Sequence, residues 1–252
     1  LHIRPEHKLR RYPFEDRRND KSKPLSVFIL SNEHAGCNWG DSSIVSIIVA
    51  QFLTDLCENK NIPFLRWLKD NCMITTIPIG NPWGYSEDSI DGYNNSNGVN
   101  INRNYDTPGW CLGEYDLGGG HGEYAGSESE TQHIMNTVHL CNAHVCMSMH
   151  GVGHHNEIPT QDGYAQMQGQ GFDHSIRRRL EEILSTSYNL GLEADITDYN
   201  DPYHTGKSPS YFQWFGAVGG LTETVPWNAL TGEYFDAVSM EAGYTEMLLF
   251  LQ

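Results

Sequence analysis

Three polar side chains that could carry metal or proton-transfer chemistry lie at or just past the ends of predicted strands. His34 follows an apolar run at residues 25–31, His150 ends another run, and Glu223 lies near the end of a later one. Imidazole and carboxylate groups bind divalent metals and transfer protons in many enzymes. A single histidine in a loop is usually only a polar surface residue. Three such groups at one edge of one sheet instead indicate a functional site.

Other kinds of catalytic site find no support in the sequence. It has no G-x-S-x-G elbow, no G-x-x-x-x-G-K loop, no G-x-G-x-x-G after a strand and no H-E-x-x-H helix. These motifs mark, in that order, one class of serine hydrolases, phosphate-binding loops, dinucleotide-binding folds and one class of zinc proteases. One alternative metal cluster stays open, because His144, Cys146 and His150 share a strand face by the period of two.

Strands and helices that alternate along the chain would position these groups. Apolar runs predict buried strands at residues 25–31, 73–79, 143–150 and 216–225. Capping residues and helical periodicity predict four helices: one from an N-cap at Asp41 to Leu56, one opened by a capping box of Ser127 and Glu130, and two at residues 172–190 and 234–251. The alternation predicts a single α/β domain with a mixed, mostly parallel sheet and helices on both faces. Ligands of such sheets bind beyond the carboxyl ends of the strands.

The composition excludes several classes of protein. In 252 residues, 11% aromatic side chains exclude a disordered chain, and the longest apolar run, at 44–56, is too short to cross a bilayer. The net charge is −16, yet residues 1–23 hold 8 of the 16 basic residues and only 4 of the 32 acidic ones. The acidic remainder would repel nucleic acid. We therefore expect a basic lead-in or linker at 1–23, one domain at 24–252, and neither a nucleic-acid nor a membrane partner.

Five short motifs, in order, resemble those of the zinc carboxypeptidases, the family that includes pancreatic carboxypeptidase A. Residues 81–85 (NPWGY) resemble N-P-D-G-[YF], and residues 98–105 (GVNINRNY) resemble G-V-D-x-N-R-N-[FW]. Residues 126–131 (GSESET) resemble S-E-x-E-[TV], and residues 147–150 (MSMH) resemble S-x-H. Residues 203–223 look like the stretch from the family's mobile tyrosine to its catalytic glutamate. The resemblance runs from about residue 25 to the C-terminus and implies the zinc carboxypeptidase fold.

The resemblance also implies an activity, which is hydrolysis of a C-terminal peptide or related amide bond by water activated by one zinc ion. His34 and His150 would bind the zinc, and Glu223 would be the general base. Asn102 and Arg103 would bind the free carboxylate of a peptide or small substrate, since a guanidinium fork matches a carboxylate. Tyr203 would close over the substrate and donate a hydrogen bond.

The third metal ligand departs from the family pattern. Three residues after His34, where the family has a ligand glutamate, the chain has Cys37. A thiolate is an anionic zinc ligand, so Cys37 is the candidate, with a plain buried thiol as the alternative. We expect Glu33, which precedes His34, to point the wrong way, and Asp41 to cap a helix.

Two further departures concern groups around the metal. Asn100 stands where the family has an aspartate that accepts a ring N–H from the first ligand histidine, so it could accept that bond only without the charge. No Arg or Lys lies in residues 86–97, and Tyr93 occupies roughly the position of the family's oxyanion-stabilising arginine. A phenol could donate one neutral hydrogen bond in its place.

These departures keep two other functions open. One is a catalytically impaired peptidase relative that binds a carboxylate ligand, because the carboxylate-recognition residues look intact while the metal and oxyanion residues are altered. The other is a hydrolase of acyl-amino acids or cell-wall peptides on the same fold, because Asn102 and Arg103 suit any substrate with a free carboxylate.

Overall fold

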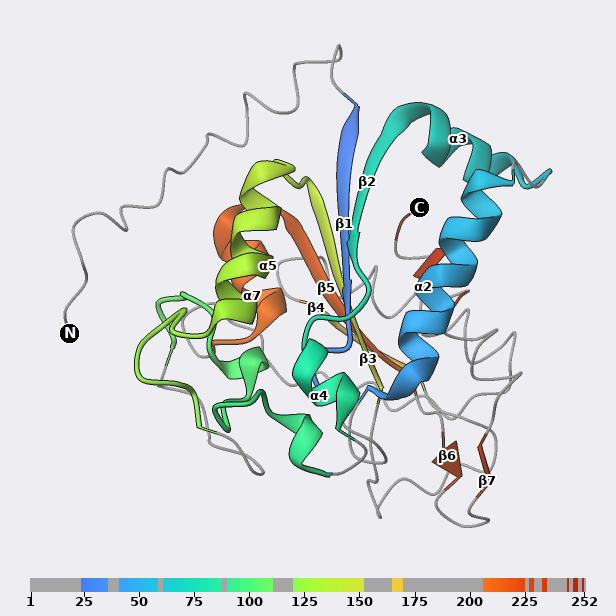
Figure 1. Cartoon of the computed structure of the whole chain (residues 1–252). Coiled ribbons are helices and arrows are strands. Elements are labelled where there is room, and N and C mark those ends of the chain that lie inside the picture. The colour runs from blue at the N-terminus through green and yellow to red at the C-terminus, as the bar shows by residue number, and fades with distance from the viewer. Residues whose placement is uncertain are drawn as a thin grey trace.

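A computed structural model of the chain describes the parts of the sequence that build the central sheet and its neighbours (Figure 1). The described residues are 24–35, 41–58, 61–87, 90–110, 120–151, 165–169, 206–224, 227–228, 233–234, 244, 247–248 and 251. Of the predicted elements, the helix at 172–190 lies outside these residues, as do the predicted site residues Cys37 and Tyr203.

A five-stranded sheet in the order β2-β1-β3-β5-β4 forms the centre of the molecule. Its strands are β1 (Leu25–Ser31), β2 (Cys72–Ile77), β3 (Val145–Gly151), β4 (Ala165–Gly169) and β5 (Val218–Thr224). All neighbouring pairs are parallel except β4 with β5, which is antiparallel. The predicted mixed, mostly parallel sheet is therefore confirmed.

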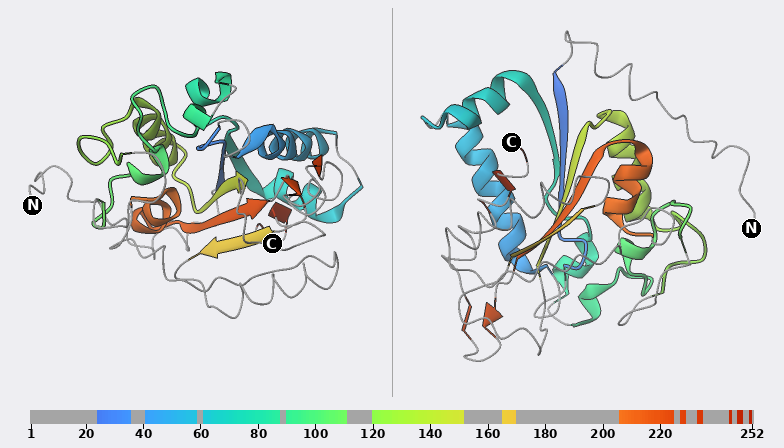
Figure 2. Two further views of the ribbon diagram at one scale, coloured as in Figure 1. Left: turned by 90° about the horizontal axis from the view of Figure 1, so that it is seen from below. Right: turned by 180° about the vertical axis from the view of Figure 1, so that it is seen from behind.

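Helices cover both faces of this sheet, as the sequence predicts. Helices α2 (Ser42–Cys57) and α3 (Pro63–Asn71) lie on one side, and α5 (Ser129–Leu140) and α7 (Ser208–Phe215) lie on the other (Figures 1 and 2). No helix among the described residues is long and apolar enough to span a membrane.

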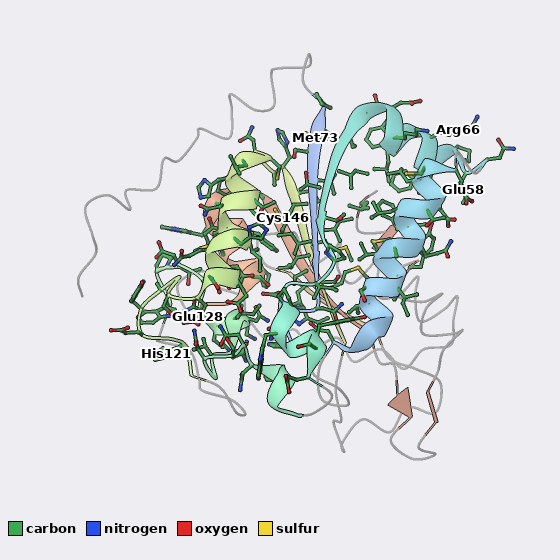
Figure 3. All side chains as sticks on the ribbon, viewed as in Figure 1. Glu58, Arg66, Met73, His121, Glu128 and Cys146 are labelled. Carbon is green, nitrogen blue, oxygen red and sulfur yellow. The ribbon has the colours of Figure 1, made fainter. Side chains whose placement is uncertain are left out.

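Two apolar cores explain why β1 is a continuous apolar run. On one face, Phe28 and Leu30 pack in a core that also contains side chains of α5 and α7 and the buried thiol of Cys146 (Figure 3). On the other face, Val27 and Ile29 pack in a core with side chains of α2 and α3. Successive residues of a strand point to opposite faces, so a strand buried on both sides is apolar at every position.

Several element boundaries differ from the prediction. The predicted capping box of α5 does not form, because the Ser127 hydroxyl donates to Glu128 and the N-cap residue Glu128 makes no side-chain cap bond. Tyr234, the predicted start of the closing helix, instead pairs in a short strand: β6 (Trp227–Asn228) pairs with β7 (Glu233–Tyr234). Residues 244, 247–248 and 251 are helical, as predicted.

The described residues between β2 and α5 form short turns rather than long elements. They include α4 (Pro82–Ser86) and the 3₁₀ turns η2 (Ile90–Tyr93) and η3 (Ile101–Arg103). The side-chain oxygen of Asn81 accepts from the backbone N–H of Gly84, which fixes the start of α4. These turns bring the 98–105 motif to the edge of the sheet at which the parallel strands end.

Candidate active site

His34 lies in the turn that follows β1, close to the carboxyl end of the sheet. Asn32 adopts a positive φ of 57°, and its carbonyl accepts from the backbone N–H of Asn81, so the chain turns sharply after the strand. The His34 ring is buried, donates from Nε2 to Oδ1 of Asn100 (2.9 Å), and stacks on the ring of Tyr93 with centroids 4.2 Å apart. Because Nε2 is occupied by Asn100, Nδ1 is the nitrogen that remains for a ligand.

His150 lies in β3, and both of its ring nitrogens have carboxylate neighbours. Its Nε2 is 2.9 Å from Oε2 of Glu33 and 2.9 Å from the hydroxyl of Ser148. Its Nδ1 is 3.2 Å from Oδ1 of Asp41. The side chains of His150, Glu33 and Asp41 are all buried, so solvent does not screen these contacts.

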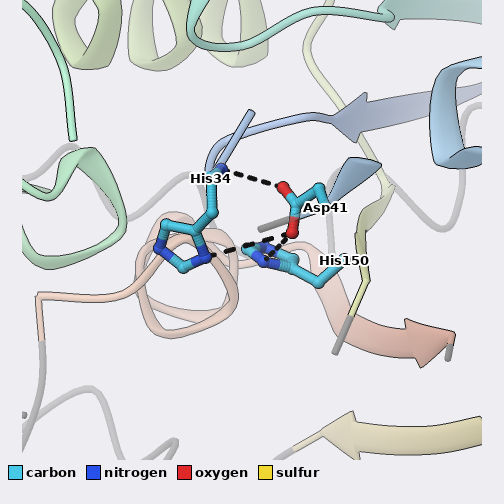
Figure 4. A group of neighbouring side chains, drawn as sticks. All are labelled: His34, Asp41 and His150. Atoms are coloured by element: carbon cyan, nitrogen blue, oxygen red, sulfur yellow. Dashed lines mark hydrogen bonds and ion pairs between the residues drawn. The ribbon is translucent and has the colours of Figure 1, made fainter. Parts of the chain in front are cut away.

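Asp41 points into this site and does not cap α2, so that prediction is wrong (Figure 4). Asp41 has the backbone angles of a helical residue rather than the extended angles of a capping residue. Its Oδ2 accepts from the backbone N–H of His34 (2.9 Å) and its Oδ1 from that of Gly151 (3.1 Å). These two bonds hold the carboxylate between the two histidines.

The absence of a side chain at Gly151 allows this approach. A Cβ atom at Gly151 would lie 2.8 Å from the carbonyl oxygen of Asp41 and 3.0 Å from its Cα. Real Cβ atoms essentially never come closer than 3.0 Å to such atoms. The end of β3 and the start of α2 can therefore meet only with glycine at this position.

His34, Asp41 and His150 form a group that could hold a metal ion. One ligand atom from each residue lies within 4.8 Å of the other two, and no other group of three His, Cys, Asp or Glu residues in the described part of the chain does the same. Two imidazole nitrogens and one carboxylate oxygen, with a position left open, are a donor set of catalytic zinc sites. The alternative cluster of His144, Cys146 and His150 does not form, because Nδ1 of His144 instead accepts from the backbone N–H of Ser26 (3.0 Å).

Burial and opposite charge set the protonation of these groups. Burial lowers the pKa of His34 to about 4, although the charge of Asp41 acts in the opposite direction. Burial alone would lower the pKa of His150, but Asp41 and Glu33 outweigh it and raise that pKa well above 6.5. Burial alone would raise the pKa of Asp41 and of Glu33, but His150 and other hydrogen-bond donors hold both below their usual values. Near neutral pH, the metal-free site therefore has a neutral His34 and a protonated His150 between two carboxylates.

The predicted carboxylate-binding residues lie beside the histidines, in η3. The backbone N–H of Asn102 donates to the same Asn100 oxygen that accepts from His34 (3.0 Å). The side-chain oxygen of Asn102 accepts from the backbone N–H of Ser208 (2.8 Å), which orients its amide group. Arg103 donates from Nη1 to the carbonyl oxygen of Asn102 (2.9 Å), and its positive charge is close enough to lower the pKa of His34.

The structure thus brings together His34, His150, Asn102 and Arg103. Glu223 lies in β5, where its Cα is the register partner of His150 in the neighbouring strand. Sequence reasoning missed Asp41 as a ligand candidate and Glu33 as a partner of His150. The signal for Asp41 was an acidic residue at the start of a helix, which also suits a capping residue.

Comparisons with known proteins find solved structures that share the fold of this chain. A metallo-carboxypeptidase from Burkholderia cenocepacia matches with a TM-score of 0.59 and 16% identity, over 90% of this chain and 56% of that one. The murein-tripeptide amidase MpaA from Escherichia coli O157 matches with a TM-score of 0.55 and 18% identity, over 90% of this chain and 82% of that one. Bovine thrombin-activatable fibrinolysis inhibitor matches with a TM-score of 0.61 and 15% identity, over 92% and 81%.

These matches establish the fold, and the chain spans little more than half of the Burkholderia enzyme. A comparison with curated proteins finds no match. The sequence pattern that defines the zinc carboxypeptidases, a family of zinc-dependent hydrolases, matches residues 8–229. The chain therefore belongs to the zinc carboxypeptidase family, peptidase family M14.

Proposed function

We propose that this protein is a zinc-dependent hydrolase that cleaves a C-terminal peptide bond, or a related amide bond, in a substrate with a free carboxylate. The observation that carries the proposal is the buried group of His34, Asp41 and His150 next to the Asn102–Arg103 pair. A metal-ligand set and a carboxylate-binding pair at one sheet edge are the two parts that such a reaction needs.

In this proposal His34, Asp41 and His150 hold the zinc ion. When bound, zinc supplies Lewis acidity, which polarises a carbonyl and allows water to react near neutral pH. Asp41 takes the third position, in preference to Cys37, because its carboxylate already lies between the two histidines. The interpretation of Cys37 as a ligand stays a prediction, since this residue lies outside the described part of the chain.

The remaining residues bind substrate and move protons. Arg103 pairs with the substrate carboxylate through its guanidinium group, and the amide of Asn102, oriented by Ser208, donates beside it. Glu223, next to His150 in the register of β5, takes a proton from the attacking water and passes it to the leaving amine. Tyr203 closes over the bound substrate. Tyr93, which stacks on His34, donates a neutral hydrogen bond to the developing oxyanion.

Neutral groups at two positions favour a second candidate, a carboxylate-binding protein with little hydrolysis. Asn100 is the uncharged partner of His34, and no Arg or Lys lies at residues 86–97 to stabilise an oxyanion. Losing one oxyanion donor costs roughly 10²–10³ in rate. The two candidates therefore differ in rate and share the same ligand chemistry.

A substrate panel tests the proposal. The zinc-loaded protein is incubated with peptides, acyl-amino acids and cell-wall peptides, each with a free or an amidated terminal carboxylate. We expect hydrolysis only of substrates with a free carboxylate, lost in Glu223→Gln and weakened mainly through KM in Arg103→Ala. Binding of free-carboxylate ligands without turnover would support the second candidate. Equal cleavage of amidated substrates would contradict the roles of Asn102 and Arg103.

A further inference from the structure

Glu33 is a wholly buried carboxylate that contacts His150 through Nε2, the ring nitrogen that does not face Asp41. Its Oε1 accepts from the hydroxyl of Tyr105 (2.7 Å), and its Oε2 accepts from the hydroxyls of Ser148 and Ser208 (2.6 Å each) and from Nε2 of His150 (2.9 Å). Buried carboxylates are costly unless they are fully paired and hydrogen-bonded. Four donors from three other segments of the chain converge on Glu33, and together they stabilise its ionised carboxylate.

We infer that Glu33 is a positioning residue that fixes the His150 ring for metal binding and supplies the second negative charge that a buried divalent cation needs. This inference rests on the proposed zinc function. It concerns a residue outside the group of His34, Asp41 and His150.

The first part of the argument is orientation. A metal-binding histidine usually donates its other ring N–H to a neighbouring group, which fixes the ring and decides which nitrogen is left for the metal. Nε2 of His150 is held by Glu33 and Ser148, so Nδ1 faces Asp41 and the candidate metal position. His34 is arranged in the same way by Asn100, which is neutral. Of the two groups that hold the Nε2 atoms, Glu33 beside His150 is ionised and Asn100 beside His34 is neutral.

The second part is charge. With both histidines neutral, the carboxylates that contact them among the described side chains are Asp41 and Glu33, with a combined charge of −2. That charge offsets a divalent cation, whereas Asp41 alone would leave one positive charge in a buried site. The neutral amide of Asn100 contributes no formal charge, so Glu33 provides the second one.

Ser208 connects this arrangement to the substrate-binding residues. Its hydroxyl lies 2.6 Å from Glu33 and 3.1 Å from the side-chain oxygen of Asn102, and its backbone N–H donates to the same oxygen. Changes at Glu33 can thus reach Asn102 as well. For this reason the test measures zinc binding directly and does not depend on turnover.

The test compares zinc affinity, by competition with a chelator, in the wild type, Glu33→Gln and a matched control. Asp55→Asn is the control, because Asp55 is also a buried carboxylate that accepts from a tyrosine hydroxyl, that of Tyr244 (2.9 Å), but lies on α2 away from the metal ligands. We expect zinc affinity to fall about 10–100-fold in Glu33→Gln. We expect it to stay within about twofold of wild type in Asp55→Asn.

A second readout separates positioning from a purely structural role. If Glu33 acts on the metal, the Tm gap between zinc-loaded and metal-free protein shrinks in Glu33→Gln, and the visible absorption bands of the Co²⁺-loaded protein shift. Wild-type zinc affinity in Glu33→Gln, with both Tm values lowered equally, would overturn the inference and leave the proposed function standing. A wild type that binds no zinc would instead overturn the proposed function.

A milder variant keeps the inference testable if Glu33→Gln does not fold. Tyr105→Phe retains the carboxylate but removes its hydrogen bond at Oε1. We expect zinc affinity about 2–10-fold weaker than wild type, a smaller effect than loss of the charge. Unchanged affinity in a folded Tyr105→Phe protein would contradict positioning through Glu33.

Discussion

Replacing Gly151 with alanine should weaken zinc binding, because the added methyl group would displace Asp41. The added carbon would lie 2.8 Å from the carbonyl oxygen of Asp41 and 3.0 Å from its Cα, both of them backbone atoms that cannot rotate away. A comfortable contact needs at least 3.4 Å, so the backbones must separate by several tenths of an ångström. The carboxylate of Asp41 moves with its backbone and loses its bond from Gly151.

Two effects follow, and each has a size. Overpacking of this kind costs about 1–3 kcal/mol in the free energy of unfolding of the metal-free protein. Ligand distances in a metal site tolerate only about 0.2 Å, so the shift of Asp41 also weakens zinc binding, by about tenfold or more. The measurements are chemical denaturation without metal and chelator competition with zinc.

Gly120→Ala is the matched control for this prediction. The nearest atom to a Cβ at Gly120 is the backbone nitrogen of Gly122, at 3.9 Å, which is an ordinary contact. We expect Gly120→Ala to change neither quantity appreciably. Wild-type zinc affinity in Gly151→Ala, with its stability lowered, would refute the view that Asp41 is held in place as a ligand by this close approach.

Three other predictions concern the neighbours of the metal. Zinc affinity should rise with pH above 6.5, because zinc must displace the proton of His150, whose pKa is raised. The same proton stabilises the metal-free protein below pH 6.5, and this stabilisation is lost as the pH rises through the raised pKa. The Tm of the metal-free protein should therefore fall over the range in which zinc binding strengthens. A Tm that rises with pH in this range would contradict this assignment. Asn100→Asp should tighten zinc binding about tenfold, because Nδ2 of Asn100 is buried with no partner among the described residues and a carboxylate would add charge behind His34; weaker binding in a folded variant would argue against it. Tyr93→Phe keeps the ring that stacks on His34 and should lower kcat about tenfold or more without changing zinc affinity, and an unchanged kcat would exclude its hydroxyl as an oxyanion donor.

Short sequence patterns are enough to predict the sheet and part of the site, namely His34, His150, Asn100 and Asn102. These features depend on residues that are close together in the sequence. The apolar run at β1 and the ordered motifs were enough for the fold. His150 and Asn102 lie within short motifs at the ends of elements, and the predicted bond from His34 to Asn100 is confirmed at 2.9 Å. Where the strands end, the parallel register brings such residues to one edge.

The remaining features depend on long-range packing. Asp41 becomes a ligand candidate only because Gly151, 110 residues later, lets β3 approach the start of α2. Glu33 is not a member of the candidate metal group, in line with the prediction that it points the wrong way, but its carboxylate contacts the far ring nitrogen of His150. Its other partners, Tyr105 and Ser208 among them, are 72 and 175 residues away, and no local spacing indicates such contacts.

Metal analysis of three proteins tests the central claim most directly. Wild type, Asp41→Ala and Cys37→Ala are dialysed against trace zinc, and bound zinc per chain is measured. The structure predicts one zinc in the wild type and in Cys37→Ala, and loss of zinc in Asp41→Ala, because Asp41 lies between His34 and His150. Zinc that is retained in Asp41→Ala and lost in Cys37→Ala would contradict the account and give the third ligand position to the thiolate.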